Sequence, residues 1–454
     1  MTSGTVLVTG AAGFIGPQVV KLLLAETDFR VIGLDSLTYA ARTDDRGESL
    51  TLQMELARLG GDARTRFSFV KMDICDPALS DILEAGRIDY LLHLAAESHV
   101  DRSIGGAPEF IRTEIQGTHN LLESIVRQNT NRARHPIKRA VLVGTDEVYG
   151  SIDRIAHTEG AAWWRLSNGQ VAGLPDEEVA ELIEVHKFRE GHPLAGGSPY
   201  AACKGGADLL ALAYFNTFTW TNKGRDEQRF PIMITRGVNN FGPYQQPEKL
   251  IPMAICTFLN PNVHGYVRRL PIYDGGTAVR EWLHTEDHAR AIVHVMEKGR
   301  PGEVYNVGTG NRLRNRDLLL AIHRECRAVD GGHADSELCQ KVFDASSEKG
   351  TARPGHDLCY AIDCSKLMAL GWQPRHVRDL DAEVARLVAW YAGNREWWQP
   401  VWEGKDFSEF WRRKYGAIAD ASSPSFEFYD TFHATRTLQD AILRVHTPVH
   451  AATS

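Results

Sequence analysis

The sequence lacks the features that would tie the chain to a membrane or to an oxidising compartment. No run of about 18 apolar residues occurs, which excludes an ordinary transmembrane helix. The first residues lead into a strand-like segment without a basic start and a long apolar run, so we expect no secretory signal. The 7 cysteines are an odd number and form no CxxC pair, which is typical of reduced thiols and favours a cytoplasmic location.

Concentrated charge and clustered metal ligands are also missing. The 51 basic and 58 acidic side chains give a net charge of −7, and no block of one sign is long enough to bind nucleic acid or a membrane surface. Any phosphate group must therefore be held by a local site. The 18 histidines are dispersed without zinc-ligand spacing to cysteine, so we expect no metal.

What the sequence does contain is an alternation of short apolar runs and helical patterns. Strands are expected at residues 5–9, 30–34, 67–74, 90–96 and 139–145, with helices at 15–25 and 109–126. This alternation predicts an α/β fold with a doubly wound parallel sheet of the Rossmann type. Such a sheet binds ligands at the carboxyl ends of its strands, where the strand order reverses. Residues 41–63, 151–197 and those from about 417 are expected to be additions to this core, and Trp163 and Trp164 to anchor the second of them.

A glycine motif follows the first strand and opens the first helix. In VTGAAGFIG, Gly10 suits a tight turn, Gly13 lets the backbone approach a pyrophosphate, and Gly16 lets helix and strand pack closely. The helix N-terminus offers free N–H groups and partial positive charge to phosphates. Asp35 ends the second strand, where its carboxylate would accept hydrogen bonds from ribose hydroxyls and repel a 2′-phosphate. The motif therefore predicts an NAD site, with NAD preferred over NADP. Asp73, at the next strand end, fits an adenine contact and a helix cap equally well.

Two further patterns carry reactive side chains. Tyr200 and Lys204 are four residues apart at the start of a helical segment and share one face. A nearby ammonium favours the phenolate, so we expect a lowered Tyr200 pKa and a base for a sugar hydroxyl. Thr145, Asp146 and Glu147 come at the end of a buried strand, where two acids are costly unless a cleft uses them. A solvated turn is the alternative for this triplet. At helical spacing, Cys203 is expected to pack rather than react.

At these residues the sequence resembles the extended short-chain dehydrogenase/reductases, and within them the dTDP-glucose 4,6-dehydratase family. The similar segments keep the family's order: TGAAGFIG (9–16), DSLTYA (35–40), HLAAESHVDRSI (93–104), TDEVYG (145–150), SPYAACK (198–204), NNFGPYQQPEKLIP (239–252), LPIYDGG (270–276), VREWLHTEDHARA (279–291), VYNVG (304–308), RPGHD (353–357) and LGWQP (370–374). The resemblance implies a nucleotide-sugar 4,6-dehydratase that usually forms a homodimer. It also implies a Rossmann domain over residues 1–238, a partly interleaved substrate-binding domain over 239–416, and a tail over 417–454.

The resemblance implies roles for the reactive residues. Tyr200 would take the C4 hydroxyl proton with help from Lys204 and Thr145, while NAD takes the hydride. The C4 ketone would make the C5 hydrogen acidic, so that Glu147 removes it as the base and Asp146 protonates the departing C6 hydroxyl. Opposite duties for two neighbouring acids require environments that separate their pKa values.

Binding residues are also implied by the resemblance. Cofactor contacts would be Gly10, Gly13, Phe14, Ile15, Gly16, Asp35, Ser36, Leu37, Thr38, Asp73, Ile74, Leu94, Ala95, Ala96, Ser98, Thr113, Tyr200, Lys204 and Asn240. Substrate contacts would be Ser98, Thr145, Asn239, Lys249, Leu250, Pro271, Tyr273, Arg280, Asn315, Arg353 and His356. Arginine forks such as those of Arg280 and Arg353 suit a diphosphate.

Several positions depart from the family pattern. Gly144 stands where a serine usually precedes the acidic triplet, Glu114 where an asparagine is usual, and Arg236 and Gly237 where smaller polar residues are usual. Two alternatives stay open. One is an epimerase, decarboxylase or 5,6-dehydratase on the same scaffold, and Asp146 speaks against an epimerase because epimerisation has no leaving hydroxyl. The other is a non-catalytic protein that binds NAD or a nucleotide sugar, which would need none of the proton-transferring residues.

Overall fold

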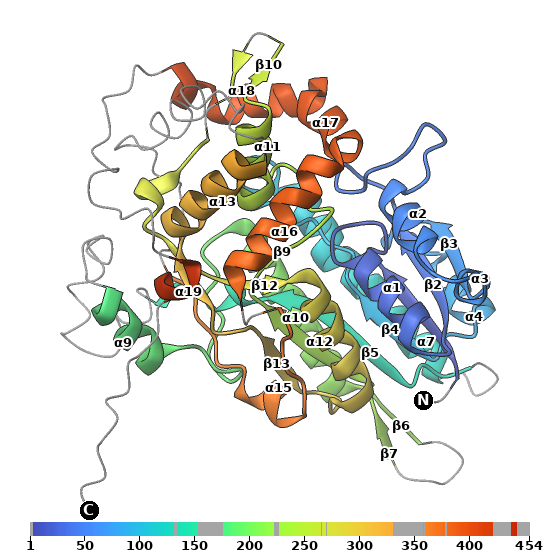
Figure 1. Cartoon of the computed structure of the whole chain (residues 1–454). Helices are drawn as coiled ribbons and strands as arrows, with labels where there is room; N and C mark the ends of the chain where they lie inside the picture. Colours follow the sequence, from blue (N-terminus) through green and yellow to red (C-terminus); the bar gives the residue numbers. More distant parts are fainter. Residues whose placement is uncertain are drawn as a thin grey trace, which may run out of the picture.

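A seven-stranded parallel sheet is the largest sheet among the described residues of the computed structural model (Figure 1). In spatial order its strands are β13 (Val304–Val307), β8 (Ile232–Gly237), β5 (Arg139–Thr145), β4 (Tyr90–His93), β1 (Thr5–Thr9), β2 (Arg30–Asp35) and β3 (Phe67–Lys71). All of the pairings are parallel. The chain starts at β1 and proceeds outward to β3, then crosses back to β4 on the other side of β1. The predicted Rossmann-type α/β fold is confirmed, with its switch point between β1 and β4.

The structure describes residues 3–130, 135–152, 176–221, 227–264, 266–268, 270–329, 357, 359–376, 379–420 and 437–442. Within them, the strands expected at 5–9 and 139–145 have the expected bounds. The strands expected at 67–74 and 90–96 end earlier, at Lys71 and His93. β3 is an edge strand whose ladder partner β2 ends at Asp35, opposite Lys71, so it has no strand to pair with further on. β4 ends at His93, opposite Thr9, the last residue of β1, although its other neighbour, β5, continues to Thr145. No helix in these ranges is long and apolar enough to cross a membrane.

Helices cover both faces of the sheet. The helix expected at 15–25 is α1 (Gly16–Glu26), and Pro17 lies in its first turn, where its missing N–H costs no hydrogen bond. The helix expected at 109–126 is a continuous helical segment made of α6 (Ala107–Phe110), the π-helical η1 (Ile111–Gly117) and α7 (Thr118–Thr130). It packs against α10 (Pro199–Thr217). A π-helical turn is wider than an α-helical one and often occurs at functional sites.

A second hydrophobic core lies around a three-stranded sheet in the order β14-β12-β9. Its strands are β9 (Asn239–Phe241), β12 (Val279–His284) and β14 (Arg312–Arg314). Its helices are α11 (Leu250–Leu259), α13 (Asn315–Val329), α16 (Leu380–Gly393), α17 (Arg395–Glu403) and α18 (Lys405–Asp420). Trp397, Trp398, Trp402 and Trp411 are fully buried there. The domain boundary after residue 238 stays a prediction; one residue separates β8 from β9 at this point.

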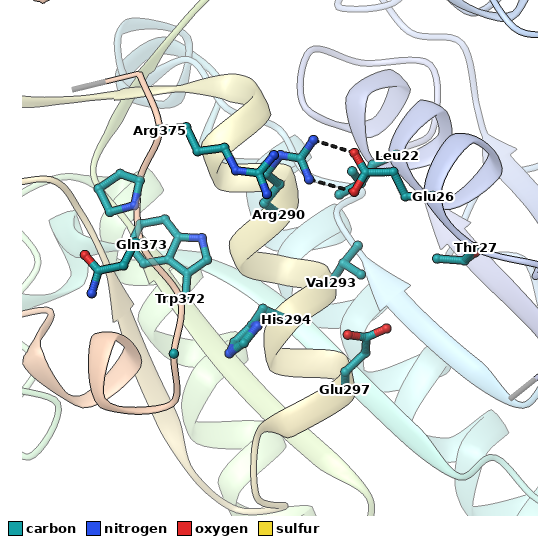
Figure 2. Close-up of a pocket in the computed structure, with 12 residues that line it drawn as sticks. Leu22, Glu26, Thr27, Arg290, Val293, His294, Glu297, Trp372, Gln373 and Arg375 are labelled. Atoms are coloured by element: carbon teal, nitrogen blue, oxygen red, sulfur yellow. Dashed lines mark hydrogen bonds and ion pairs between the residues drawn. The ribbon is translucent and has the colours of Figure 1, made fainter. Parts of the chain in front are cut away.

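The chain returns to the first core between segments of the second. Helix α12 (Thr285–Lys298) packs on α1, and β13 adds the outermost strand beside β8. Figure 2 shows a groove between α1, α12 and residues 371–375, where both Arg290 guanidinium nitrogens donate to the Glu26 carboxylate at 2.8 and 2.5 Å. This ion pair joins the two helices on the surface, away from the carboxyl ends of the strands.

The three expected additions have different structures. Residues 41–63 contain α2 (Leu50–Ala57) and the start of α3 (Gly61–Thr65) and reach the second core, where the Trp397 indole donates to Thr51 at 3.1 Å. In the second addition α9 (Asp176–His186) is a helix, whereas Trp163 and Trp164 lie outside the described residues. The tail expected from 417 begins inside α18, and Leu438, Ala441 and Ile442 join the second core.

Candidate active site

A single cleft at the carboxyl edge of the parallel sheet contains most of the predicted site residues. Of the predicted cofactor contacts, all except Leu37 line it: Gly10, Gly13, Phe14, Ile15, Gly16, Asp35, Ser36, Thr38, Asp73, Ile74, Leu94, Ala95, Ala96, Ser98, Thr113, Tyr200, Lys204 and Asn240. The Leu37 side chain packs against the hydrophobic core instead, and its backbone N–H donates to Asp35. Thr145, Asp146 and Glu147 line the same cleft.

The glycine turn has the geometry that a dinucleotide requires. Gly10 has φ +70°, and a Cβ there would lie 2.6 Å from the Ala95 nitrogen. A Cβ on Gly16 would lie 2.1 Å from the Gly10 carbonyl oxygen, so close helix–strand packing explains that glycine. On Gly13 the nearest atom to such a Cβ is 3.5 Å away, which leaves the turn open toward the cleft. The turn and the N-terminus of α1 thus offer backbone N–H groups to a phosphate.

The two strand-end acids are held in place by backbone donors. Asp35 accepts from the Ala12 N–H at 2.9 Å and from the Leu37 N–H at 2.8 Å. Asp73 accepts from the Cys75 N–H at 2.8 Å and pairs with Arg112 at 2.7 Å. Burial opposes ionisation of Asp73, but these contacts outweigh it and lower the pKa of Asp73. A fixed carboxylate at the end of β2 fits the predicted ribose contact.

The acidic triplet follows β5 directly and turns into a short 3₁₀ helix, η2 (Asp146–Tyr149). Thr145 caps this helix, since its hydroxyl accepts from the Glu147 N–H at 3.3 Å. Asp146 is 3% exposed, and its Oδ2 has no hydrogen-bond partner. Burial and the neighbouring charges of Glu147 and Glu281 raise the pKa of Asp146 well above its ordinary value. The raised pKa favours the protonated form of Asp146, which is the form that a general acid needs.

Tyr200 and Lys204 lie on the first turns of α10, as their spacing predicted. The Lys204 ammonium donates to the Val143 carbonyl at 3.1 Å and pairs with Glu114 at 3.1 Å. The expected lowering of the Tyr200 pKa is wrong for this structure. Burial, followed by the charges of Glu147 and Glu114, raises the pKa of Tyr200 well above its ordinary value. The four-residue spacing in the sequence identified the Lys204 ammonium, but it could not identify the Glu147 and Glu114 carboxylates, which oppose ionisation of Tyr200.

The departures Gly144 and Arg236 explain each other. The buried Arg236 guanidinium pairs with Asp208 at 2.7 Å and donates to the Tyr149 hydroxyl at 2.8 Å. A Cβ on Gly144 would lie 2.9 Å from the Thr235 carbonyl and 3.2 Å from the Asp208 carboxylate. A serine at position 144 would therefore collide with the strand and with the acid that holds Arg236.

The predicted substrate contacts divide into three groups. Ser98, Thr145, Asn239, Lys249 and Leu250 line the cleft, and the Lys249 ammonium donates to the Ser98 carbonyl. Pro271, Tyr273, Arg280 and Asn315 are not in its lining. The Arg280 guanidinium donates to the Asp357 carbonyl at 2.6 Å, although its charge still acts on Asp146. Arg353 and His356 lie outside the described residues.

Several cleft residues were not predicted. Glu97, Gln246 and Glu248 line the cleft within segments that had been matched to the family, so the resemblance could have identified them. Trp282 and His288 line the cleft within the matched segment 279–291 as well, whereas Arg112, on η1, lies outside the matched segments and needed the fold. Burial raises the pKa of Glu97 to about 7, with smaller contributions from Glu114 and Glu248.

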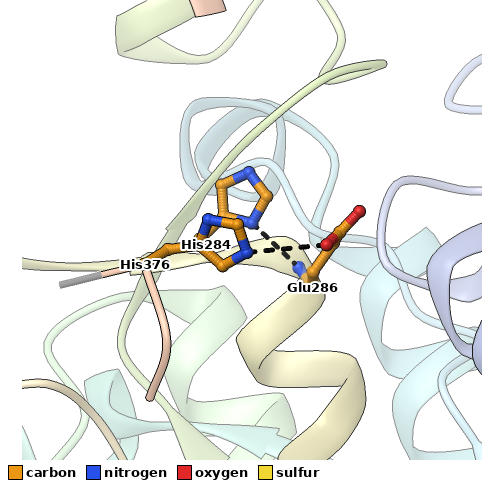
Figure 3. A group of neighbouring side chains, drawn as sticks. All are labelled: His284, Glu286 and His376. Atoms are coloured by element: carbon orange, nitrogen blue, oxygen red, sulfur yellow. Dashed lines mark hydrogen bonds and ion pairs between the residues drawn. The ribbon is translucent and has the colours of Figure 1, made fainter. Parts of the chain in front are cut away.

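A second group of titratable residues joins α12 to the chain near α16 (Figure 3). His284, Glu286 and His376 place their possible ligand atoms within 4.8 Å of one another. However, the two imidazole rings are stacked, with centroids 4.0 Å apart and an angle of 24° between planes. Because a ring nitrogen directs its lone pair within the ring plane, stacked rings do not converge on one ion. His376 pairs instead with Glu383 at 2.9 Å and with Glu286 at 3.5 Å. Lys21 also pairs with Glu286, at 2.9 Å. We therefore interpret Lys21, Glu286, His376 and Glu383 as an ion-pair cluster.

This cluster predicts a pH-dependent contribution to stability. Hydrogen bonds to Glu286 and Glu383 raise the pKa of His376 from 6.5 to about 9. The contribution is therefore complete below about pH 6.5 and is lost as the pH rises through about 9. Discounted for solvent screening, His376→Gln should lower the free energy of unfolding by about 1–2 kcal/mol at pH 6, and by much less at pH 10. Urea unfolding at both pH values measures this, with His294→Gln as the control. An equal loss at both pH values would contradict it.

Comparisons with known proteins agree with this geometry. Residues 6–308 match the NAD dependent epimerase/dehydratase family. The chain is 37% identical over 403 residues to a dTDP-glucose 4,6-dehydratase from Escherichia coli, covering 88% of this chain and 96% of that protein. It is 38% identical over 402 residues to one from Streptomyces niveus, covering 87% and 95%. The structure of the dTDP-glucose 4,6-dehydratase DesIV from Streptomyces venezuelae with NAD and TYD bound is similar, with a TM-score of 0.63, 38% identity, and 87% and 99% coverage of the two chains. With its sheet, glycine turn and Tyr–Lys helix in the arrangement described, the chain belongs to the NAD dependent epimerase/dehydratase family.

Proposed function

We propose that this protein is an NAD-dependent nucleotide-sugar 4,6-dehydratase, with dTDP-glucose as the substrate best supported by its relatives. The observation that carries the proposal is the convergence of Tyr200 with Asp146 and Glu147 in the cleft that contains the glycine turn. Oxidation of an alcohol needs one base near the coenzyme. Elimination of water needs an additional acid and base, and this cleft provides both.

Each side chain has a defined part in the proposed reaction. Bound NAD supplies the hydride chemistry, accepting hydride from C4 of the hexose and returning it to C6. Tyr200 receives the proton of the C4 hydroxyl, while the Thr145 hydroxyl and the Lys204 ammonium orient the alcohol and the base. The C4 ketone makes the C5 hydrogen acidic, so Glu147 can remove it. Asp146 gives its proton to the departing C6 hydroxyl, which leaves as water. As the hydride returns to C6, the proton held by Glu147 returns to C5, so that atoms and charge balance over the cycle.

The choice of dTDP-glucose rests on the relatives, which are named as dTDP-glucose 4,6-dehydratases at 37% and 38% identity. The test is incubation of the purified protein with dTDP-glucose, UDP-glucose and GDP-mannose, followed by product absorbance in alkali. We expect the 4-keto-6-deoxy product from dTDP-glucose without added coenzyme, because a coenzyme that is regenerated in each cycle can stay bound. Turnover of none of the three would overturn the proposal.

We also propose that the enzyme is a homodimer. Ile104, Ile111 and Leu209 are 39%, 49% and 59% exposed and come from α5 (Val100–Gly105), η1 and α10. These segments pack together, so their apolar side chains can form one surface that a second copy would cover. Sedimentation equilibrium should give twice the 50.6 kDa chain mass, and Leu209→Arg should halve it.

A further inference from the structure

The Glu114 carboxylate is the immediate partner of the Lys204 ammonium. It is 1% exposed, and its Oε2 lies 3.1 Å from Lys204 Nζ. Its Oε1 accepts from the Glu97 N–H at 2.9 Å, so both oxygens are engaged. Glu114 comes from the wide turn of η1, and Lys204 from α10, which packs against that turn. The acid is therefore fixed in position rather than a mobile surface group.

The ion pair with Glu114 weakens the effect of the Lys204 charge on the ionisation of the Tyr200 phenol. An isolated ammonium favours the phenolate, whereas a carboxylate at 3.1 Å from the ammonium offsets that effect. The negative charge of Glu114 also acts on Tyr200 directly and disfavours its ionisation. Burial raises the pKa of Glu114 itself, while Lys204 and the Glu97 N–H lower it. Protonation of Glu114 would therefore release Lys204 to act on Tyr200 at full charge.

We propose that Glu114 is a positioning residue that acts on Tyr200 both directly and through its ion pair with Lys204, and so sets the pH at which Tyr200 becomes a base. The role of Glu114 in catalysis rests on the proposed dehydratase function. Its effect on the ionisation of Tyr200 is independent of that function. Other charged or titratable groups also face Tyr200, Lys204 and Glu114. Asp146 and Glu147 act on Tyr200. Asp208 and His93 lie near Lys204, and Glu97 and Cys203 lie near Glu114. None of these forms the ion pair with Lys204 that Glu114 forms.

The substrate-independent test is a spectroscopic titration of Tyr200 in the full-length, NAD-saturated protein. Tyrosinate absorbance is recorded against pH, and the curve of the Tyr200→Phe variant in the same background is subtracted. Glu114→Gln keeps the size and an acceptor oxygen but removes the charge. We expect its Tyr200 midpoint to lie roughly one pH unit below that of the wild type. A midpoint equal to or above the wild-type value would overturn the proposal.

A second variant keeps the test decisive if Glu114→Gln does not fold. Glu114→Asp retains the charge on a shorter side chain and weakens the pair without abolishing it. Its midpoint should move in the same direction by less than that of Glu114→Gln, and no movement would contradict the proposal.

Steady-state kinetics with dTDP-glucose test whether Glu114 contributes to catalysis. In Glu114→Gln the acidic limb of the kcat/KM profile should move to lower pH by the same amount, with KM changed less than about twofold. A raised KM with an unmoved limb would indicate a merely structural role and overturn the proposal. If the wild type turns over no sugar, the dehydratase assignment fails, while the titration still decides the role of the ion pair.

Discussion

Replacing Asp146 by Asn is expected to slow water elimination by about 10²–10⁴-fold while C4 oxidation continues. Asp146 is buried with its Oδ2 unpartnered, and burial with neighbouring negative charge raises its pKa well above the ordinary value. A protonated carboxyl can donate to the departing C6 hydroxyl. An asparagine has nearly the same shape but no acidic proton. Single-turnover measurement of coenzyme absorbance should therefore show reduced coenzyme that accumulates and is not reoxidised.

Glu147→Gln is the matched variant, because it should stop the reaction one step earlier. Both variants should accumulate reduced coenzyme. In D₂O, Asp146→Asn should still exchange the C5 hydrogen for deuterium, whereas Glu147→Gln should not. Dehydration at the wild-type rate by Asp146→Asn would refute its role as the acid, and normal C5 exchange in Glu147→Gln would refute the role of that residue as the base.

Replacing Arg236 by Met is expected to lower the free energy of unfolding by about 3–5 kcal/mol, the largest stability effect that we predict. Arg236 and Asp208 side chains are 3% and 1% exposed, and their contact is 2.7 Å long. Removing the guanidinium would leave the Asp208 carboxylate buried without its cation, while methionine fills similar space. Urea unfolding monitored by tryptophan fluorescence measures the loss.

The control for this prediction removes both charges. Arg236→Met combined with Asp208→Leu replaces the pair by apolar side chains and should recover most of the lost stability. A loss below about 1 kcal/mol in the single variant would contradict the prediction, since it would mean that Asp208 is satisfied without Arg236.

Features that depend on neighbouring residues in the sequence could be predicted without the structure. The Gly10 turn, the strand end at Asp35 and the Tyr200–Lys204 face each lie within a few residues of chain. Local periodicity and the chemistry of glycine and aspartate are sufficient to place them. The end of β3 was predicted too late because the ladder of this edge strand stops where its neighbour β2 ends, at Asp35.

Features that depend on contacts between distant elements could not be predicted. The sequence identified Glu114 as unusual, but only the packing of η1 on α10 shows that it pairs with Lys204. For the same reason the direction of the Tyr200 pKa was wrong: the helix spacing revealed one cation and none of the carboxylates around it. Gly144 and Arg236 appeared as separate departures, and the structure shows that they share Asp208.

The most direct test of the proposed mechanism follows a single hydrogen. The purified enzyme is incubated with dTDP-glucose that carries deuterium at C4, and the 4-keto-6-deoxy product is examined by NMR. If a coenzyme that remains bound accepts hydride at C4 and returns it at C6, the deuterium must appear at C6 of the product. Product without deuterium at C6, or release of the label with no product, would contradict this account.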